Sequence, residues 1–97
     1  MTAAADGVPA IVHRPEASRF EAAYDEGLAV CVYRREGDLV LITHTEVPVM
    51  LEGRGIAAAL VQATLGWARA QGLRVRPLCS YVVAYMRRHP QTQDLLG

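Results

Sequence analysis

Neither sign of charge is in excess in this sequence, because ten basic residues balance ten acidic ones. A protein that binds nucleic acid through surface charge needs a basic face, so this balance argues against a nucleic-acid partner. The sequence also lacks an apolar run of about 18 residues, the length that a membrane-spanning helix requires. Its first ten residues, MTAAADGVPA, have neither the basic start nor the long apolar block of a signal peptide. These absences predict a cytoplasmic protein without nucleic-acid or membrane partners.

Cysteine and histidine are scarce, which limits disulfide and metal chemistry. Cys31 and Cys79 are expected to be reduced thiols, since no export signal takes them to an oxidising compartment. The histidines lie at positions 13, 44 and 89, without the spacing of zinc ligands. Residues 44–46 and 77–79 match the zinc deaminase pattern only in part, because Leu78 interrupts its second half and no cysteine follows Cys79. We therefore expect no metal site.

The sequence does contain enough apolar residues for one core. With 97 residues, 52% of them hydrophobic, it fits a single compact domain. We expect residues 1–9 to form a flexible tail and residues 10–97 to form the domain. We expect a monomer or a weak dimer, because the sheet edge beside the N-terminal strand could pair with another molecule.

The N-terminal half shows the alternation of antiparallel strands. We expect a short strand over 11–15 and further strands over 19–24, 28–35 and 39–47. Residues 25–27 and 35–38 have the polar, glycine-containing composition of hairpin loops. Because Pro48 has no N–H to donate, regular pairing should break or bulge there.

The C-terminal half is helical from 55 to 71, where apolar residues recur in two adjacent stripes. Gly72 followed by Leu73 fits a glycine C-cap. A short strand over 74–79 follows at once, which gives a parallel strand–helix–strand unit. Ser80 is expected to cap a last helix over 81–88, which Pro90 ends. The fold class predicted is α+β: an antiparallel sheet continued by a strand–helix–strand unit, with two helices packed against it.

The stretch between the last meander strand and the long helix has the composition of an anion site. Gly53 and Gly55 allow the backbone to approach a ligand without a Cβ in the way. The helix that follows begins with unpaired N–H groups and a partial positive charge. Strand, Gly-x-Gly turn and helix start together predict a phosphate or pyrophosphate seat. The alternative is a loop that merely needs two flexible residues.

These residues resemble the fingerprint of the GNAT superfamily of acetyl-CoA-dependent N-acetyltransferases, and more closely a minimal single-domain branch of it. The matching blocks are His44-Thr45-Glu46-Val47-Pro48, Gly53-Arg54-Gly55-Ile56-Ala57, Pro77-Leu78-Cys79 and Arg87-Arg88-His89-Pro90. The resemblance spans roughly residues 10 to 96. It implies a GNAT-like fold and acetyl-CoA, or coenzyme A, as cosubstrate.

The resemblance also implies where the cosubstrate binds. The backbone N–H groups of Gly53, Arg54, Gly55, Ile56, Ala57 and Ala58 would hold its pyrophosphate. Val47 and Val49 would offer main-chain contacts to the thioester and the pantetheine arm. Arg87 and Arg88 would suit its phosphates, or would instead complement the dipole at a helix end. Glu52 stands where Gln or Arg is usual, and its carboxylate would repel a pyrophosphate by about 1 kcal/mol if solvated.

Three residues are candidates for the chemistry. Cys79, before a helix start, is a candidate nucleophile or else a small buried hydrophobe; Cys31 is expected to be structural. Glu46 is a candidate general base or a rim carboxylate, and strand alternation places it on the face of Val40 and Ile42. Tyr85 matches the tyrosine that many GNAT enzymes use as general acid, or it packs in the core.

The function predicted is acetyl transfer from acetyl-CoA to an amine that the sequence does not identify. In one mechanism Glu46 aids direct attack by the amine, and in the other Cys79 is transiently acetylated. The alternative is a CoA- or acyl-CoA-binding module without transferase activity, because the sequence lacks the N-terminal segments that wall the acceptor site in larger GNAT enzymes. A purely structural interaction domain would leave the glycine turn without a ligand.

Overall fold

One five-stranded sheet organises residues 10–97, the part of the chain described by this computed structural model; the tail predicted over residues 1–9 lies outside it. The strands are β1 (Val12–Arg14), β2 (Arg19–Tyr24), β3 (Gly27–Glu36), β4 (Leu39–Glu46) and β5 (Arg74–Pro77). They lie in sequence order, the first four antiparallel and β5 parallel to β4. The predicted meander and strand–helix–strand unit are confirmed, and so is the α+β fold class.

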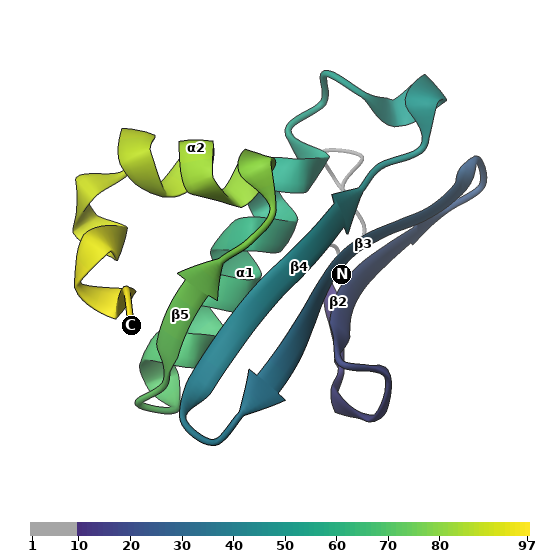
Figure 1. Cartoon of the computed structure of the whole chain (residues 1–97). Coiled ribbons are helices and arrows are strands. Elements are labelled where there is room, and N and C mark those ends of the chain that lie inside the picture. Colours follow the sequence, from purple (N-terminus) through teal and green to yellow (C-terminus); the bar gives the residue numbers. More distant parts are fainter. Residues whose placement is uncertain (1–9) are drawn as a thin grey trace.

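Two α-helices and three short 3₁₀ segments complete the fold of residues 10–97. They are α1 (Ile56–Ala70), α2 (Ser80–Arg88), η2 (Pro15–Ala17), η3 (Val49–Leu51) and η4 (Pro90–Leu95). Figure 1 shows α1 lying across one face of the sheet, α2 beyond the end of β5, and the opposite face of the sheet turned to the viewer. Within residues 10–97, no helix combines the length and the apolar character needed to cross a bilayer.

The core lies between α1 and the sheet. Ile56, Leu60, Val61, Leu65 and Ala68 are buried on the helix, as the two apolar stripes predict. They pack in one cluster with sheet residues such as Phe20, Cys31, Val40 and Ile42. At the end of α1 the amides of Gly72 and Leu73 bond to the carbonyls of Arg69 and Ala68, at 3.2 and 2.8 Å. This is the Schellman geometry that the glycine C-cap predicts, with Gly72 at a φ of +70°.

The start of α2 differs from the prediction. Cys79, and not Ser80, occupies the N-cap position, and Ser80 is the first helical residue. The reason is that the amides of Leu78 and Cys79 both donate to the carbonyl of Ile42, at 2.9 and 3.1 Å. These bonds keep the chain extended at Cys79 (φ −83°, ψ 130°), so the helix begins directly after it.

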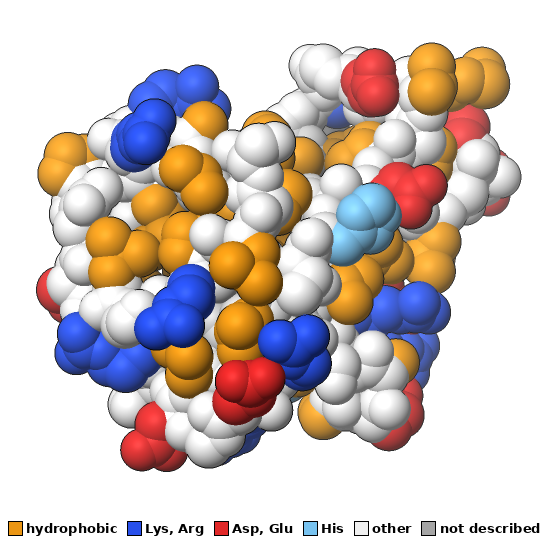
Figure 2. Space-filling view, in the orientation of Figure 1, with side chains coloured by type: hydrophobic (Ala, Val, Ile, Leu, Met, Phe, Trp, Pro, Cys, Tyr) orange, Lys and Arg blue, Asp and Glu red, His pale blue; other side chains and the backbone are white. Residues whose placement is uncertain are grey.

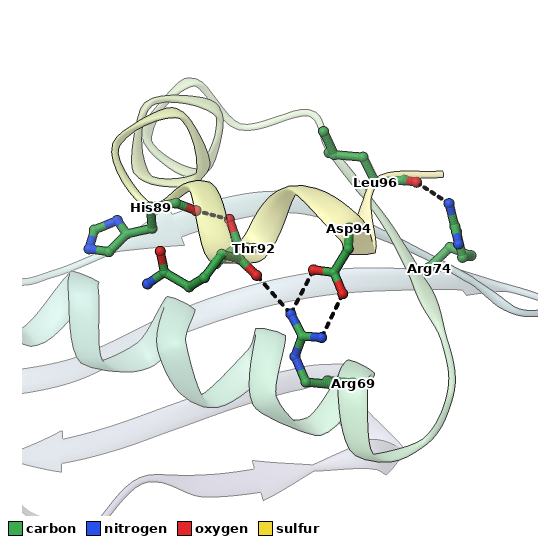
Figure 3. A network of polar contacts seen from close by, with 7 residues as sticks. Arg69, Arg74, His89, Thr92, Asp94 and Leu96 are labelled. Carbon is green, nitrogen blue, oxygen red and sulfur yellow. Dashed lines mark hydrogen bonds and ion pairs between the residues drawn. The ribbon is translucent and has the colours of Figure 1, made fainter.

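The C-terminal 3₁₀ segment η4 was not predicted, because Pro90 reads as the end of one helix although it also suits the first position of the next. Arg69 of α1 binds it: its guanidinium donates to both carboxylate oxygens of Asp94, at 2.7 and 2.8 Å, and to the carbonyl of Gln91. Figure 3 shows Arg69 reaching from α1 to this segment. The contacts fasten the C-terminal segment over the helix.

Candidate functional site

The main cavity of the described residues lies where β4 and β5 part. The last paired residues are Ile42 and Pro77, whereas β4 continues to Glu46 without a β5 partner. Figure 1 shows the end of β4 and the segment that follows β5 diverging beyond this point. The cavity has a volume of about 390 Å³ and is lined by Thr45, Val47, Leu51, Glu52, Gly53, Gly55, Ile56, Ala57, Ala58 and Tyr81. Such a volume is in the range of small-molecule sites.

The glycine turn forms one wall of this cavity. Gly53 and Gly55 have φ values of +84° and +77°, and no atom lies within 4 Å of the position that a Cβ would take at either residue. Gly55 is also the N-cap of α1 and brings no capping side chain. The first amide to bond back to the turn is that of Ala59, which donates to the Gly55 carbonyl at 3.1 Å. The amides of residues 56–58 therefore have no carbonyl four residues earlier within the helix, and their residues face the cavity.

A bulge in β4 decides which side chains reach the cavity from the sheet. Val32 pairs with His44 and Tyr33 with Ile42, so Thr43 has no partner opposite it. The extra residue reverses the alternation, which is why Thr45 pairs with the buried Cys31 on the core face. The bulge predicted near Pro48 thus lies five residues earlier, although regular pairing does end before Pro48.

The same bulge corrects the predicted face of Glu46. Glu46 and His44 lie on the sheet face opposite Val40 and Ile42, since Thr45 between them is the residue that faces the core. Their side chains are exposed and contact each other, with Glu46 Oε1 3.2 Å from His44 Nε2. Glu46 therefore lies beside the gap between the strands but outside the cavity lining.

Cys79 lies behind the cavity wall, half-buried. Its thiol donates to the Thr45 hydroxyl at an S–O distance of 3.7 Å. Burial alone would raise the pKa of Cys79, but the amides of Val82 and Tyr81 and the hydroxyl and backbone of Thr45 outweigh it, so the pKa is lowered. The Cys79 side chain makes no capping hydrogen bond to α2. The amides at the start of the helix act on the sulfur through their dipoles.

The two tyrosines of α2 have different positions. Tyr81 lines the cavity, and burial raises its pKa while the nearby Arg88 opposes that shift. Tyr85 is buried, stacks on His89 with ring centroids 4.0 Å apart, and lines a second hollow between α1 and η4. His89 Nδ1 lies 2.7 Å from the Tyr85 carbonyl, so the imidazole can cap the C-terminal end of α2.

The predicted cosubstrate residues divide into two groups. Those that line the cavity are Val47, Gly53, Gly55, Ile56, Ala57 and Ala58. Those outside the lining are Val49, Arg54, Arg87 and Arg88. Val49 and its neighbour Met50 are 80% and 75% exposed, and Figure 2 shows hydrophobic side chains at the tip of the molecule where η3 lies. Figure 2 also shows basic side chains over the C-terminal end of α2, the position of Arg87 and Arg88.

Four lining residues were not among the predicted site residues, and one of them, Glu52, was expected only as a carboxylate that repels the pyrophosphate. Thr45 was missed because its inward direction depends on the bulge, a property of the pairing between β3 and β4 and not of local sequence. Tyr81 was missed because the start of α2 was placed one residue late. Leu51 is fully buried in η3 and offers no chemical signal in the sequence.

Comparisons with known proteins give one family. The family model described as GCN5-related N-acetyl-transferase matches residues 19–95. Protein NATD1 of Gallus gallus and of Homo sapiens are each 35% identical to this chain over 68 residues, which is 69% of this chain and 62% and 60% of those proteins. The match thus spans less than two thirds of each relative. The solution NMR structure of a "GCN5-like putative N-acetyltransferase" from Staphylococcus aureus superposes with a TM-score of 0.73 and 26% identity, over 91% of this chain and 87% of that one.

Proposed function

This chain belongs to the GCN5-related N-acetyltransferase family, and from that premise we propose that it transfers an acetyl group from acetyl-CoA to an amine. The observation that carries the proposal is the start of α1 on the cavity: residues 56–58 line it, and their amides have no intrahelical acceptor. Residues 10–97 form the single acetyltransferase domain in this proposal. Both cysteines are free thiols, which accords with the predicted cytoplasmic location.

The residues present fit a cosubstrate that carries a diphosphate. N–H groups at a helix start, without a Cβ at Gly53 or Gly55, suit the close approach of phosphate oxygens. Val47 lines the same cavity directly after β4, beyond the point where that strand loses its β5 partner, and its backbone would therefore suit an amide-containing arm. Arg88 acts electrostatically on Tyr81, a lining residue, and this supports Arg88 as the arginine of α2 that would contact a phosphate.

Acetyl-CoA, when bound, supplies an activated acetyl thioester. In the direct route the amine nitrogen bonds to the acetyl carbon, the C–S bond to CoA breaks, and Glu46 or water takes the proton of the amine. Glu46 would act from the outer face of the sheet, through the gap beyond Ile42 and Pro77. Approach of the amine from that face keeps it apart from the phosphate seat on the helix side.

In the covalent route the Cys79 sulfur takes the acetyl group and CoA leaves as its thiol. The amine then takes the acetyl group from Cys79, loses a proton, and the Cys79 thiol is restored. Cys79 is placed for this because its sulfur contacts Thr45, whose side chain lines the cavity. Tyr81, which lines the cavity, is the proposed proton donor to CoA. Tyr85, the residue expected from the resemblance, lines the hollow between α1 and η4 and is the alternative.

The test measures CoA thiol release with a thiol-reactive dye while the protein is incubated with acetyl-CoA and a panel of amines. The panel includes a polyamine, free amino acids, a lysine peptide and a peptide with a free N-terminus. We expect at least one acceptor to raise thiol release above the no-acceptor control. Micromolar binding of acetyl-CoA by calorimetry without any acceptor-dependent release would identify a CoA-binding module instead, and absence of binding would overturn the proposal.

Cys79→Ala separates the two routes. If Cys79 carries the acetyl group, rapid mixing of the wild-type protein with acetyl-CoA gives a burst of CoA and an increase in protein mass by one acetyl group, and the variant gives neither. Full activity in Cys79→Ala would leave the direct route. Glu46→Gln is the matching variant for that route, and we expect it to lower kcat.

A further inference from the structure

Four small polar side chains connect α1 to the start of α2 through the sheet. Thr64 of α1 and Thr45 of β4 both act through their hydroxyls on Cys31 of β3, and Thr45 also accepts the hydrogen bond from Cys79. Thr64 is anchored by donating to the Leu60 carbonyl at 2.9 Å. Thr45 is thus the one hydroxyl of this row that contacts both thiols.

The two thiols at the ends of these contacts have opposite properties. Cys31 has no exposed surface, and burial raises its pKa more than the hydroxyls of Thr64 and Thr45 lower it. Cys79 is only half-buried and sits at the start of a helix. Thr45 therefore stands between an inert thiol in the core and a thiol next to the cavity.

The direction of Thr45 is fixed by the bulge at Thr43. Without the extra residue His44 would face the core and Thr45 would face solvent. The bulge therefore places a hydroxyl, and not an imidazole, at 3.7 Å from the Cys79 sulfur, with its other side on the cavity. A buried hydroxyl can accept from a thiol and, after rotating, donate to a thiolate.

We propose that Thr45 is a positioning residue for Cys79: its hydroxyl holds the sulfur at the cavity wall and donates a hydrogen bond to the thiolate when the thiol loses its proton to water. This inference rests on the proposed function, in which the acetyl end of the cosubstrate lies at Cys79. It assigns the bulge in β4 a role in preparing a nucleophile as well as in opening the sheet.

Few other groups affect the ionisation of this sulfur. The titratable group that faces it from β3 is Cys31, and the one that follows it in α2 is Tyr81. His44 and Glu46 of β4 lie on the other face of the sheet. Among the polar contacts that lower its pKa, that of Thr45 Oγ1 comes from a side chain, whereas those of Val82, Tyr81 and Thr45 N come from the backbone. The Thr45 hydroxyl is therefore the side chain whose removal should change the reactivity of Cys79.

The test is the rate of iodoacetamide alkylation of Cys79 as a function of pH, without acetyl-CoA, with the modified peptide identified by mass spectrometry. Thr45→Val keeps the shape of the side chain and removes the hydroxyl. We expect the midpoint of the curve of alkylation rate against pH to rise by about half a pH unit, and the alkylation rate below this midpoint to fall about threefold. Thr45→Ser should restore the wild-type profile. Thr43→Val, which removes an exposed hydroxyl two residues away, is the control and should match the wild type.

A wild-type profile in Thr45→Val would overturn the proposal, as would a Thr45→Ser profile displaced as far as that of Thr45→Val. Should Thr45→Val fail to fold, Thr45→Ala takes its place with the same expected result. Because the assay contains no acetyl-CoA, a failure of the proposed acetyltransferase activity does not alter its outcome.

Discussion

Glu52 places a carboxylate on the cavity that the glycine turn and the start of α1 also line. Its side chain is exposed and lines the cavity beside Gly53. Two like unit charges about 4 Å apart in water repel each other by roughly 1 kcal/mol, which corresponds to about a fivefold change in Kd. The carboxylate thus opposes the phosphate seat without blocking it.

Glu52→Gln should therefore bind acetyl-CoA more tightly, with Kd lowered by up to about fivefold at low ionic strength. The amide has the same size and removes the repulsion. Isothermal titration calorimetry measures the change, and it should shrink when salt is added. Asp38→Asn, in the turn between β3 and β4, removes an equal charge from outside the cavity lining and should leave Kd unchanged. Equal Kd values for Glu52→Gln and the wild type would contradict a phosphate seat at this turn.

At the scale of elements, the turn between η3 and α1 depends on left-handed backbone. Gly55 at a φ of +77° both ends the turn and begins α1. Gly37, at a φ of +62° in the turn between β3 and β4, has the same left-handed backbone conformation without a place in the cavity. A non-glycine residue in such a conformation costs about 1–2 kcal/mol. Comparing substitutions at Gly55 and Gly37 therefore separates the energetic cost of the left-handed conformation from its role in the cavity.

Gly55→Ala and Gly37→Ala should each lower the free energy of unfolding by about 1–2 kcal/mol in urea denaturation. Only Gly55→Ala should weaken acetyl-CoA binding, because its methyl group stands at the cavity wall beside the amides of α1. Calorimetry at a temperature where both variants are folded gives the comparison. Equal losses of affinity in the two variants would mean that Gly55 serves only the backbone.

The contact between α1 and η4 is electrostatic at its centre. The Arg69 guanidinium holds the pKa of Asp94 below its ordinary value, and both side chains are exposed. A carboxylate with a lowered folded-state pKa stabilises the fold above its unfolded pKa, and this stabilisation is lost as the pH falls through the folded value. The contribution is therefore present at neutral pH and absent in strong acid.

Asp94→Asn should lower Tm slightly at neutral pH, since exposed ion pairs contribute little and are screened by salt. The difference from the wild type should disappear as the pH is lowered below the ordinary pKa of 3.8. Thermal unfolding followed by circular dichroism measures it, with Asp25→Asn in the turn between β2 and β3 as the matched charge change. A difference that persists in acid would show that packing, and not charge, fastens η4.

The elements that the sequence predicted well are those set by local patterns. Alternation marked β2 and β3, the apolar stripes marked α1, and Gly72 marked its end. The bulge at Thr43 escaped prediction because it depends on how β3 and β4 pair, and the segment 39–46 alternates plausibly in either register. The inward Thr45 and the outward Glu46 follow from that pairing. The cavity wall at residues 53–58 was predictable because glycine and helix start act locally.

At the scale of the whole molecule, an aromatic cluster joins the edge of the sheet to the helix layer. His13 of β1 stacks on Phe20 of β2 with ring centroids 4.1 Å apart and is hydrogen-bonded to the Tyr33 hydroxyl of β3 at 2.7 Å. Trp67 of α1 meets the same imidazole edge-on at 4.7 Å. Three elements, β2, β3 and α1, thus contact one ring of β1, which fastens this three-residue edge strand to the core.

This ring should make the stability of the fold depend on pH near neutrality. Burial lowers the pKa of His13 below its ordinary value of 6.5, against an opposing effect of Glu16. Since the unfolded chain then binds a proton more readily than the fold, the free energy of unfolding rises with pH across the window from the lowered value to 6.5. The stabilisation is complete above that window, is lost progressively as the pH falls through it, and does not change further below it.

His13→Phe, which keeps the stacking and cannot titrate, should flatten this dependence. Urea denaturation at about pH 7.5 and about pH 5 should show a loss of stability in the wild-type protein that is smaller in the variant. Glu21 and Asp94 have lowered pKa values and therefore titrate below this range. His44→Gln changes an exposed imidazole outside the cluster and should retain the wild-type dependence. If His13→Phe loses as much stability as the wild type between these pH values, the ring is not the group that links protonation to the docking of β1.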